Sequence, residues 1–222
     1  MENKKQFYHI TLVEEKFKQV FLKYTDENTA DALFKDVVKK YSAKSRHYHD
    51  MNHICGMCDC WDLFKHKLKN PDEIFMAIIY HDIIYKPTRS DNEEKSADYF
   101  LKKVATLLNI DSLRVLSIPP AILSTKHSDA SRALWENNLD IQYLLDFDLH
   151  VLGTPHSSEY EWYRTGVRKE YKIYPDFMYK PGRKKVLESF LNRKKIYLTE
   201  DWKINEKKAR KNLQEEIKLY LC

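Results

Sequence analysis

The chain is predicted to fold as an all-α protein, and three features of its 222 residues support that prediction. Apolar side chains recur every three or four residues along almost the whole chain, which is the period of an amphipathic helix. Glycine occurs only four times, and no Asn-Gly or Asp-Gly dipeptide marks a tight β-hairpin. Apolar residues make up 43% of the chain and charged residues 32%, a balance that can bury a core and argues against disorder.

Four helices are predicted before residue 86. Thr25 and Asp26 can cap the second helix, and Pro71 suits the first turn of the fourth. The fourth helix is apolar almost all the way round, so we expect it to be the central buried helix. These helices are expected over 7–24, from the cap at Thr25 and Asp26 to Tyr41, over 49–68 and over 72–85.

Six further helices are predicted in the rest of the chain. No internal repeat, low-complexity tract or Gly/Ser linker separates them, so we expect one compact domain. Apolar stripes near both termini also permit a homodimer. The expected ranges are 91–109, 111–127 with a break at Pro119-Pro120, 137–146, 156–174, 182–196 and 199–221.

Glycine spacing excludes two classes of nucleotide-binding motif. A P-loop needs two glycines five residues apart, and a dinucleotide-binding fingerprint needs three within six positions. The two nearest glycines here, Gly153 and Gly166, are 13 residues apart. Any phosphate-bearing ligand must therefore be held in another way.

Composition also predicts a cytoplasmic protein without a membrane partner. The longest apolar run, Ile74–Tyr80, is too short to span a bilayer, and the first ten residues lack the apolar core of a signal peptide. Three of the four cysteines are crowded into residues 55–60 instead of being spread as a disulfide framework would be. The net charge of +5 comes from scattered basic residues, which does not favour nucleic acid as a partner.

Histidine and aspartate residues in apolar surroundings are candidate metal ligands. His81-Asp82 lies near the end of the most apolar helix, where burial is costly unless a cation or a hydrogen bond compensates for it. Asp146 and Asp148 interrupt another apolar run. A hydrogen-bonded core histidine is the alternative for His81-Asp82 alone. The order His53, then His81-Asp82, then Asp148 favours a metal site instead.

The order H…HD…D on an all-helical chain resembles the HD superfamily of metal-dependent phosphohydrolases. A larger set of motifs resembles a subfamily of predicted HD phosphohydrolases and covers residues 7–220. The resemblance implies a compact HD-domain-like helical bundle over residues 1–222, with a metal-site core at about 45–153 and C-terminal helices 156–221 packed on it. The motifs are Arg46-x-Tyr48-His49-x-x-x-His53, His81-Asp82-Ile83-Ile84-Tyr85, Asn92-Glu93-x-x-Ser96-Ala97, Thr125-Lys126-His127, Asp146-x-Asp148-Leu149-x-x-Leu152-Gly153, Tyr160-x-x-Tyr163 and Val167-Arg168-x-Glu170-Tyr171.

The resemblance implies that His53, His81, Asp82 and Asp148 are the metal ligands. Asp146 is the alternative to Asp148, although orienting a ligand histidine suits it better. Two imidazoles and two carboxylates suit Mn²⁺, Fe²⁺, Co²⁺, Ni²⁺ or Mg²⁺ and do not choose among them. The implied activity is cleavage of a small phosphoester, with a nucleotide favoured, by attack of a metal-activated water.

Three further residues have implied catalytic roles. His49 occupies the place of the proton donor in the similar YHNxxH motif of cyclic-nucleotide phosphodiesterases. Lys126 and Arg168 are candidates for neutralising phosphate charge, with a surface salt bridge as the alternative for each.

Six other motif positions are candidates for substrate binding. An arginine could bind phosphate, a histidine could contact the substrate, two polar residues could line the pocket, and two tyrosines could stack on a base. Helix capping is the alternative for the asparagine, and packing is the alternative for the tyrosines. These residues are Arg46, His127, Asn92, Glu93, Tyr160 and Tyr163.

The cysteine cluster departs from the family pattern. Cys55 and Cys58 have the Cys-x-x-Cys spacing of zinc ligands, and Cys60 follows, but no second ligand pair occurs at finger-like spacing. Helix packing is therefore favoured over metal or redox chemistry.

A second class of function stays open alongside the hydrolase. A catalytically silent module could keep the HD scaffold and bind a nucleotide or a protein partner. The intact set of four ligands favours the enzyme, because a binding module has no need to retain every ligand.

Overall fold

Helices provide all the regular secondary structure that the structure describes. The computed structural model describes residues 2–220, and side chains over 9–128 and 130–220. No strand occurs in this part of the chain, and the all-α prediction is confirmed. No helix among these residues is both long and apolar enough to cross a membrane.

The first helix packs a pair of aromatic rings, and the second begins where its predicted cap places it. α1 (Glu2–Phe21) buries Phe17 and Phe21, whose rings stack with centroids 3.8 Å apart. α2 (Glu27–Tyr41) begins after Asp26, whose carboxylate accepts the Thr29 backbone N–H at 3.0 Å. The predicted cap is therefore present, and it satisfies one of the amides that the first turn leaves free.

α4 (Pro71–Tyr80) is the central buried helix, as predicted. Every residue from Asp72 to Tyr80 is buried, and the helix packs against α3 (Met51–Phe64), α6 (Ser112–Ser124) and α8 (Leu139–Asp148). The helix ends at Tyr80 rather than at Tyr85, so His81 and Asp82 lie in the turn that follows it. The N–H of His81 still donates to Ala77 O, which fixes the orientation of that turn.

The middle of the chain differs from the prediction in one instructive way. α5 (Asn92–Tyr99) continues through a π-helical turn, Phe100–Val104, and a 3₁₀ turn, Ala105–Leu107. α6 then runs without a break through Pro119 and Pro120, where an interruption was expected. Two prolines cost helical hydrogen bonds, but Ile118, Pro119, Ala121 and Ile122 are all buried. Packing against α4 and α5 compensates for the lost bonds.

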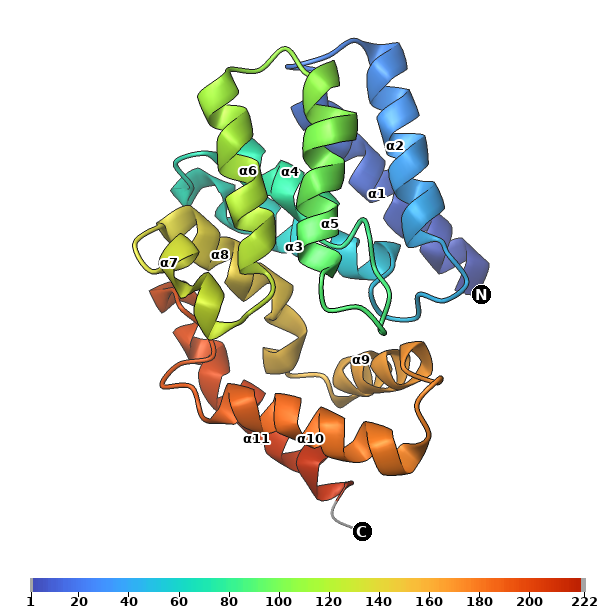
Figure 1. Ribbon diagram of the computed structural model, residues 1–222, viewed down its shortest axis with the longest axis vertical. Coiled ribbons are helices and arrows are strands. Elements are labelled where there is room, and N and C mark those ends of the chain that lie inside the picture. Colours follow the sequence, from blue (N-terminus) through green and yellow to red (C-terminus); the bar gives the residue numbers. More distant parts are fainter. Residues whose placement is uncertain (1, 221–222) are drawn as a thin grey trace.

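The C-terminal helices lie at one end of the molecule (Figure 1). A short turn, Asp129–Ser131, and α7 (Arg132–Trp135) precede α8, and a 3₁₀ turn, His150–Gly153, follows it. Next come α9 (Ser157–Glu170), α10 (Asp176–Leu191), a 3₁₀ segment, Glu200–Asn205, and α11 (Glu206–Lys218). α9 and α11 both contact the His150–Gly153 turn, which joins this end to the central helices.

A buried ion pair holds the C-terminal helices together. Arg183 on α10 donates to Glu216 on α11 at 2.8 Å, and both side chains are buried. Tyr160 on α9 also donates to Glu216, and Arg183 donates to the Tyr163 hydroxyl. All three helices therefore share one hydrogen-bonded network, in which both charges are satisfied.

Candidate metal centre

Two imidazole rings meet where α3 passes the end of α4. The Nε2 atoms of His53 and His81 are 3.4 Å apart, and both side chains are buried. His81 Nδ1 lies 2.9 Å from the Ile78 carbonyl oxygen, so Nδ1 donates there and the neutral ring offers its Nε2 lone pair to the site. His53 Nδ1 has no hydrogen-bond partner among the described residues. A divalent cation is a natural partner for two Nε2 lone pairs directed at the same point.

Two carboxylates complete the cluster. Asp82 Oδ2 lies 3.3 Å from His81 Nε2, and Asp148 Oδ1 lies 3.2 Å from His53 Nε2 and 3.7 Å from His81 Nε2. Ligand atoms of His53, His81 and Asp82 all lie within 4.8 Å of one another, so this group could hold a metal ion. Imidazole nitrogens with carboxylate oxygens are the donor set of many divalent metals, so the residues fit the ion that the family resemblance implies.

The charges of the four residues suit a cation. Burial lowers the pKa of His53 to about 4 against the opposing pull of Asp148, which keeps this imidazole neutral. Burial disfavours a charge on His81 too, but Asp82 and Asp148 outweigh it and raise its pKa to about 9. The histidines in turn hold the pKa of Asp82 and of Asp148 below the usual range, although burial opposes this. A proton on His81 and a divalent cation are thus alternative ways of balancing the same two carboxylates.

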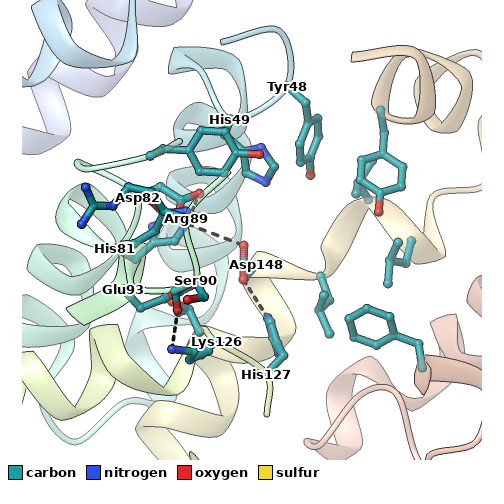
Figure 2. Close-up of a pocket in the computed structure, with 18 of the residues that line it drawn as sticks. Tyr48, His49, His81, Asp82, Arg89, Ser90, Glu93, Lys126, His127 and Asp148 are labelled. Atoms are coloured by element: carbon teal, nitrogen blue, oxygen red, sulfur yellow. Dashed lines mark hydrogen bonds and ion pairs between the residues drawn. The ribbon is translucent and has the colours of Figure 1, made fainter. Parts of the chain in front are cut away.

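His127 acts on the cluster through Asp148. Its Nε2 lies 2.8 Å from Asp148 Oδ2, and Figure 2 shows Asp148 between His81 and His127. The backbone of His127 has φ 51°, a left-handed conformation that is unusual outside glycine. Arg193 donates to its carbonyl oxygen at 2.5 Å. His127 therefore orients a carboxylate of the cluster, a contact that the sequence analysis did not assign to it.

His49 is held by a carboxylate that the sequence analysis quoted but gave no role. Its Nδ1 lies 2.7 Å from Glu170 Oε2, and Glu170 Oε1 accepts the backbone N–H groups of His47, Tyr48 and His49 at 2.8 to 2.9 Å. The Tyr85 hydroxyl donates to the same carboxylate at 3.0 Å. Burial opposes a charge on either partner, but the contact raises the pKa of His49 and lowers that of Glu170 to about 2.

Arg46 has a different set of partners from the phosphate that the resemblance implied. It is buried, and its guanidinium donates to the carbonyl oxygens of His49, Asp82 and Ile83 at 2.9, 2.7 and 3.1 Å. It also stacks over the rings of Tyr41 and Tyr85. Arg46 therefore fastens the turn that carries Asp82 to the loop that carries His49, and it does not line the cavity described next.

A cavity of about 370 Å³, which we call the metal cavity, opens beside the cluster (Figure 2). It brings together most of the residues that the sequence analysis selected. Residues from six separate stretches of the chain line it, and His53 lies behind this lining. The selected residues that line it are His49, His81, Asp82, Asn92, Glu93, Lys126, His127, Asp148 and Tyr163.

Polar residues from the start of α5 and from the segment that follows α6 form one wall of the metal cavity. Lys126 Nζ donates to the Ser90 carbonyl at 2.7 Å and pairs with Glu94 at 2.5 Å. Asn92 makes two hydrogen bonds of 3.0 Å with the backbone of Lys86, so it closes the 86–92 loop while it lines the cavity. Burial raises the pKa of Glu93 in this wall.

Two further selected residues, besides Arg46 and His53, do not line the metal cavity. Arg168 donates to Asp176 at 2.7 Å and to the carbonyl oxygens of Tyr171 and Tyr174, which ties the end of α9 to the start of α10. Tyr160 donates to Glu216 in the buried network, which agrees with the packing alternative. The sequence could not separate these side chains from substrate-binding ones, because their partners are distant in sequence or are backbone groups.

Asp146 also has partners other than the metal cluster. Its carboxylate is fully buried and accepts the backbone N–H groups of Leu198 and Thr199 at 2.7 and 2.8 Å, together with the Thr199 hydroxyl. Asp146 therefore anchors the segment before α11. The sequence analysis favoured a different role for Asp146, that of orienting a ligand histidine.

The cysteine cluster belongs to the packing of α3. Cys55 and Cys58 are buried, and burial raises the pKa of the Cys55 thiol to about 11 and that of the Cys60 thiol to about 12. These three thiols are free and do not form a metal-binding group with other described residues. High thiol pKa values make them poor nucleophiles and poor ligands at neutral pH.

Comparison of the chain with protein-family models, with curated proteins and with solved structures finds no match. The conclusions about this site therefore rest on its geometry: an all-helical protein contains a buried group of histidine and aspartate side chains that could hold a metal ion.

Proposed function

We propose that the protein is a metal-dependent phosphohydrolase that cleaves a small phosphoester, with a nucleotide as the favoured substrate. The observation that supports this most strongly is the convergence of His53, His81 and Asp82, with Asp148 beside them, at the edge of an open cavity. These four groups come from three separate parts of the chain. A structural hydrogen bond between neighbouring residues would not require such a convergence.

These four residues would hold one divalent cation, which supplies a water of lowered pKa and stabilises charge on phosphoryl oxygens. The remaining chemistry falls to other side chains of the metal cavity. Lys126 has three ammonium donors, of which two are used by Ser90 and Glu94. The third is available to a phosphate oxygen.

His49 is the proton donor in this proposal. Its Nδ1 is engaged by Glu170, which fixes the ring and leaves Nε2 as the nitrogen that can serve the cavity it lines. Glu170 also raises the pKa of His49, so the imidazolium form persists further toward neutral pH. A protonated His49 can give its proton to the oxygen that leaves phosphorus, which avoids an alkoxide product.

Metal content and turnover test the proposal together. Wild type and Asp82→Ala would be loaded with Mn²⁺, Fe²⁺, Co²⁺, Ni²⁺ or Mg²⁺, assayed by mass spectrometry for bound metal, and incubated with a panel of nucleotides and simple phosphoesters. We expect near-stoichiometric metal and turnover in wild type and loss of both in Asp82→Ala. Asp98→Ala is the matched control, because Asp98 is an exposed carboxylate on α5 that pairs with Lys102.

Two results would contradict different parts of the proposal. Metal lost in Asp82→Ala without turnover in wild type would contradict the hydrolase and favour a silent module that binds a nucleotide or protein partner. Wild type that binds none of these ions would contradict the ligand assignment itself.

A further inference from the structure

A second cavity adjoins the metal cavity and has a different chemical character. It has a volume of about 450 Å³, and we call it the tyrosine cavity because Tyr163, Tyr171, Tyr174 and Tyr179 line it. Val167, Met178 and Val186 add aliphatic surface. We infer that this cavity binds a planar aromatic group in the alcohol portion of the substrate, as in a nucleoside phosphate. The substrate part of this inference rests on the proposed function.

The tyrosine cavity lies directly beside the metal cavity. His49, Tyr163 and Tyr171 line both cavities, so a single ligand can extend from one into the other. His49 stands at that boundary. A substrate with its phosphate in the metal cavity and its alcohol portion in the tyrosine cavity therefore places the ester oxygen near the proposed proton donor.

The two cavities differ in the charge of the residues that line them. Asp82, Asp148, Lys126 and other ionisable groups line the metal cavity. Only two basic side chains, His49 and Arg183, line the tyrosine cavity, and they are paired with Glu170 and Glu216 respectively. The tyrosine cavity therefore offers no unpaired charge to an anion, and an uncharged group is its natural occupant.

The tyrosine rings that line the cavity favour an aromatic ring as the uncharged group that binds there. The ring centroids of Tyr171 and Tyr174 are 6.2 Å apart, and those of Tyr171 and Tyr179 are 6.1 Å apart. Rings gathered at such spacings favour stacked and edge-to-face contacts with another ring. A flat ring can make such contacts with these side chains, whereas an alkyl chain cannot stack on them.

The reaction balances with the substrate in this orientation. Water supplies the oxygen of the new P–O bond and releases one proton to solvent, while the ester P–O bond breaks and its oxygen gains one proton from His49, which regains a proton from solvent. The products are inorganic phosphate and an alcohol that carries the aromatic group.

Gly182 allows the tyrosine cavity to be filled without disturbing the core. It lines the cavity, and a Cβ atom built on it meets no heavy atom within 4 Å. Gly182→Phe therefore adds a ring at the wall of the cavity without a clash at Cβ. Lys185→Phe is the matched control, because it adds the same side chain at an exposed position of α10 that does not line the cavity.

The first measurement is binding of adenosine, observed by saturation-transfer NMR, with ribose as the ligand that lacks the ring. Adenosine has no phosphate, so this arm does not depend on turnover. We expect adenosine to bind wild type and Lys185→Phe, and to lose its signal in Gly182→Phe and in Tyr174→Ala. Equal signals from adenosine and ribose in wild type would overturn the inference, and so would adenosine binding that survives both cavity variants.

The second measurement compares kcat/KM for adenosine 5′-monophosphate and ribose 5-phosphate in the metal-loaded protein. Because stacking of one base on aromatic side chains is worth on the order of 10-fold in affinity, we expect wild type and Lys185→Phe to prefer the nucleotide by about that factor. In Gly182→Phe the preference should fall to within about 2-fold. Adenosine binding without any turnover would contradict the proposed function while the cavity assignment stands. Turnover of both esters with no preference would contradict the cavity assignment while the proposed function stands.

Discussion

The carboxylate of Glu170 and the imidazole of His49 face each other at 2.7 Å, although 121 residues separate them in the chain. The same carboxylate accepts three consecutive backbone N–H groups, from His47 to His49. One side chain of α9 therefore fixes both the loop that carries His49 and the ring itself. This contact is one of those that join the C-terminal helices to the metal cavity.

Glu170→Gln should weaken both functions of this contact. An amide carries no charge, so the pKa of His49 should fall, and the alkaline limb of the pH profile of kcat, where the proton donor loses its proton, should move to lower pH. Loss of a charge-assisted contact should also lower the free energy of unfolding by about 1.5–3 kcal/mol. A kcat profile over pH 5–9 and urea denaturation would measure these changes.

Glu161→Gln is the control for that substitution, because Glu161 lies on the same helix and pairs with Arg164 at the surface. It should change neither quantity appreciably. If Glu170→Gln left the pH profile in place, Glu170 would have only a structural role.

Stability should depend on pH through the same pair. The folded-state pKa of Glu170 is about 2, below its ordinary value of 4.5, so its contribution is present above pH 4.5 and is lost as the pH falls toward 2. The folded-state pKa of His49 lies above 6.5, so its contribution is present below pH 6.5 and is lost as the pH rises through the folded-state value. Melting temperatures measured across pH 2–9 should therefore lose these two slopes in the double variant Glu170→Gln, His49→Gln.

Metal binding should release protons. Because Asp82 and Asp148 raise the pKa of His81 to about 9, this ring is a positively charged imidazolium at pH 7 when no cation balances the carboxylates. Ligation needs the neutral ring, so each bound ion should displace about one proton. Isothermal titration of Mn²⁺ in buffers of different ionisation enthalpy would count them. A count near zero at pH 7 would contradict the assignment of His81 as a ligand.

Two glycines should respond in opposite directions to the same substitution. A Cβ on Gly166 would lie 2.7 Å from the His47 carbonyl oxygen, whereas a Cβ on Gly182 meets nothing within 4 Å. Gly166→Ala should therefore push α9 from the 47–49 loop and cost about 1–3 kcal/mol. Gly182→Ala should stabilise α10 by up to about 1 kcal/mol, because alanine is the better helix former. Denaturant unfolding of both variants checks the contrast, and equal effects would show that the close approach of α9 is unimportant.

Substitution of the two aspartates of the Asp146-x-Asp148 motif should have different effects on stability and on metal binding. Asp146→Ala removes the acceptor for three donors at Leu198 and Thr199, so it should cost at least about 3 kcal/mol of stability. Metal content at low temperature should stay near that of wild type. Asp148→Ala should lose metal affinity with a smaller effect on stability. Unfolding curves and metal analysis on the same samples would show whether the two roles are reversed.

Local signals made much of the fold predictable. Asp26 and Pro71 mark helix starts by their chemistry alone, and the apolar character of 72–80 placed the central helix. The order of His53, His81-Asp82 and Asp148 favoured a metal site, and His81-Asp82 and Asp148 stand in apolar stretches where they require a partner. The path of α6 through Pro119 and Pro120 was not predictable, because burial against α4 decides it.

The partners of charged side chains were the least predictable part of the site. Arg46 and Arg168 were expected to bind phosphate, yet the structure directs them mainly to backbone carbonyl oxygens. Backbone groups leave no trace in the side-chain pattern, so a buried arginine that fastens a turn looks like a ligand-binding one. Glu170 escaped assignment for the same reason, since most of its donors are main-chain amides.

The close approach at Gly166 has a consequence for how this protein could be altered. All four candidate ligands precede α9, whereas the lining of the tyrosine cavity comes mainly from α9 and α10. The proposed recognition of the alcohol and the proposed binding of the ion would thus be encoded in successive stretches of the gene. A library confined to the codons of the second stretch can explore new specificities, provided that it spares Gly166 and Glu170, which couple the two halves.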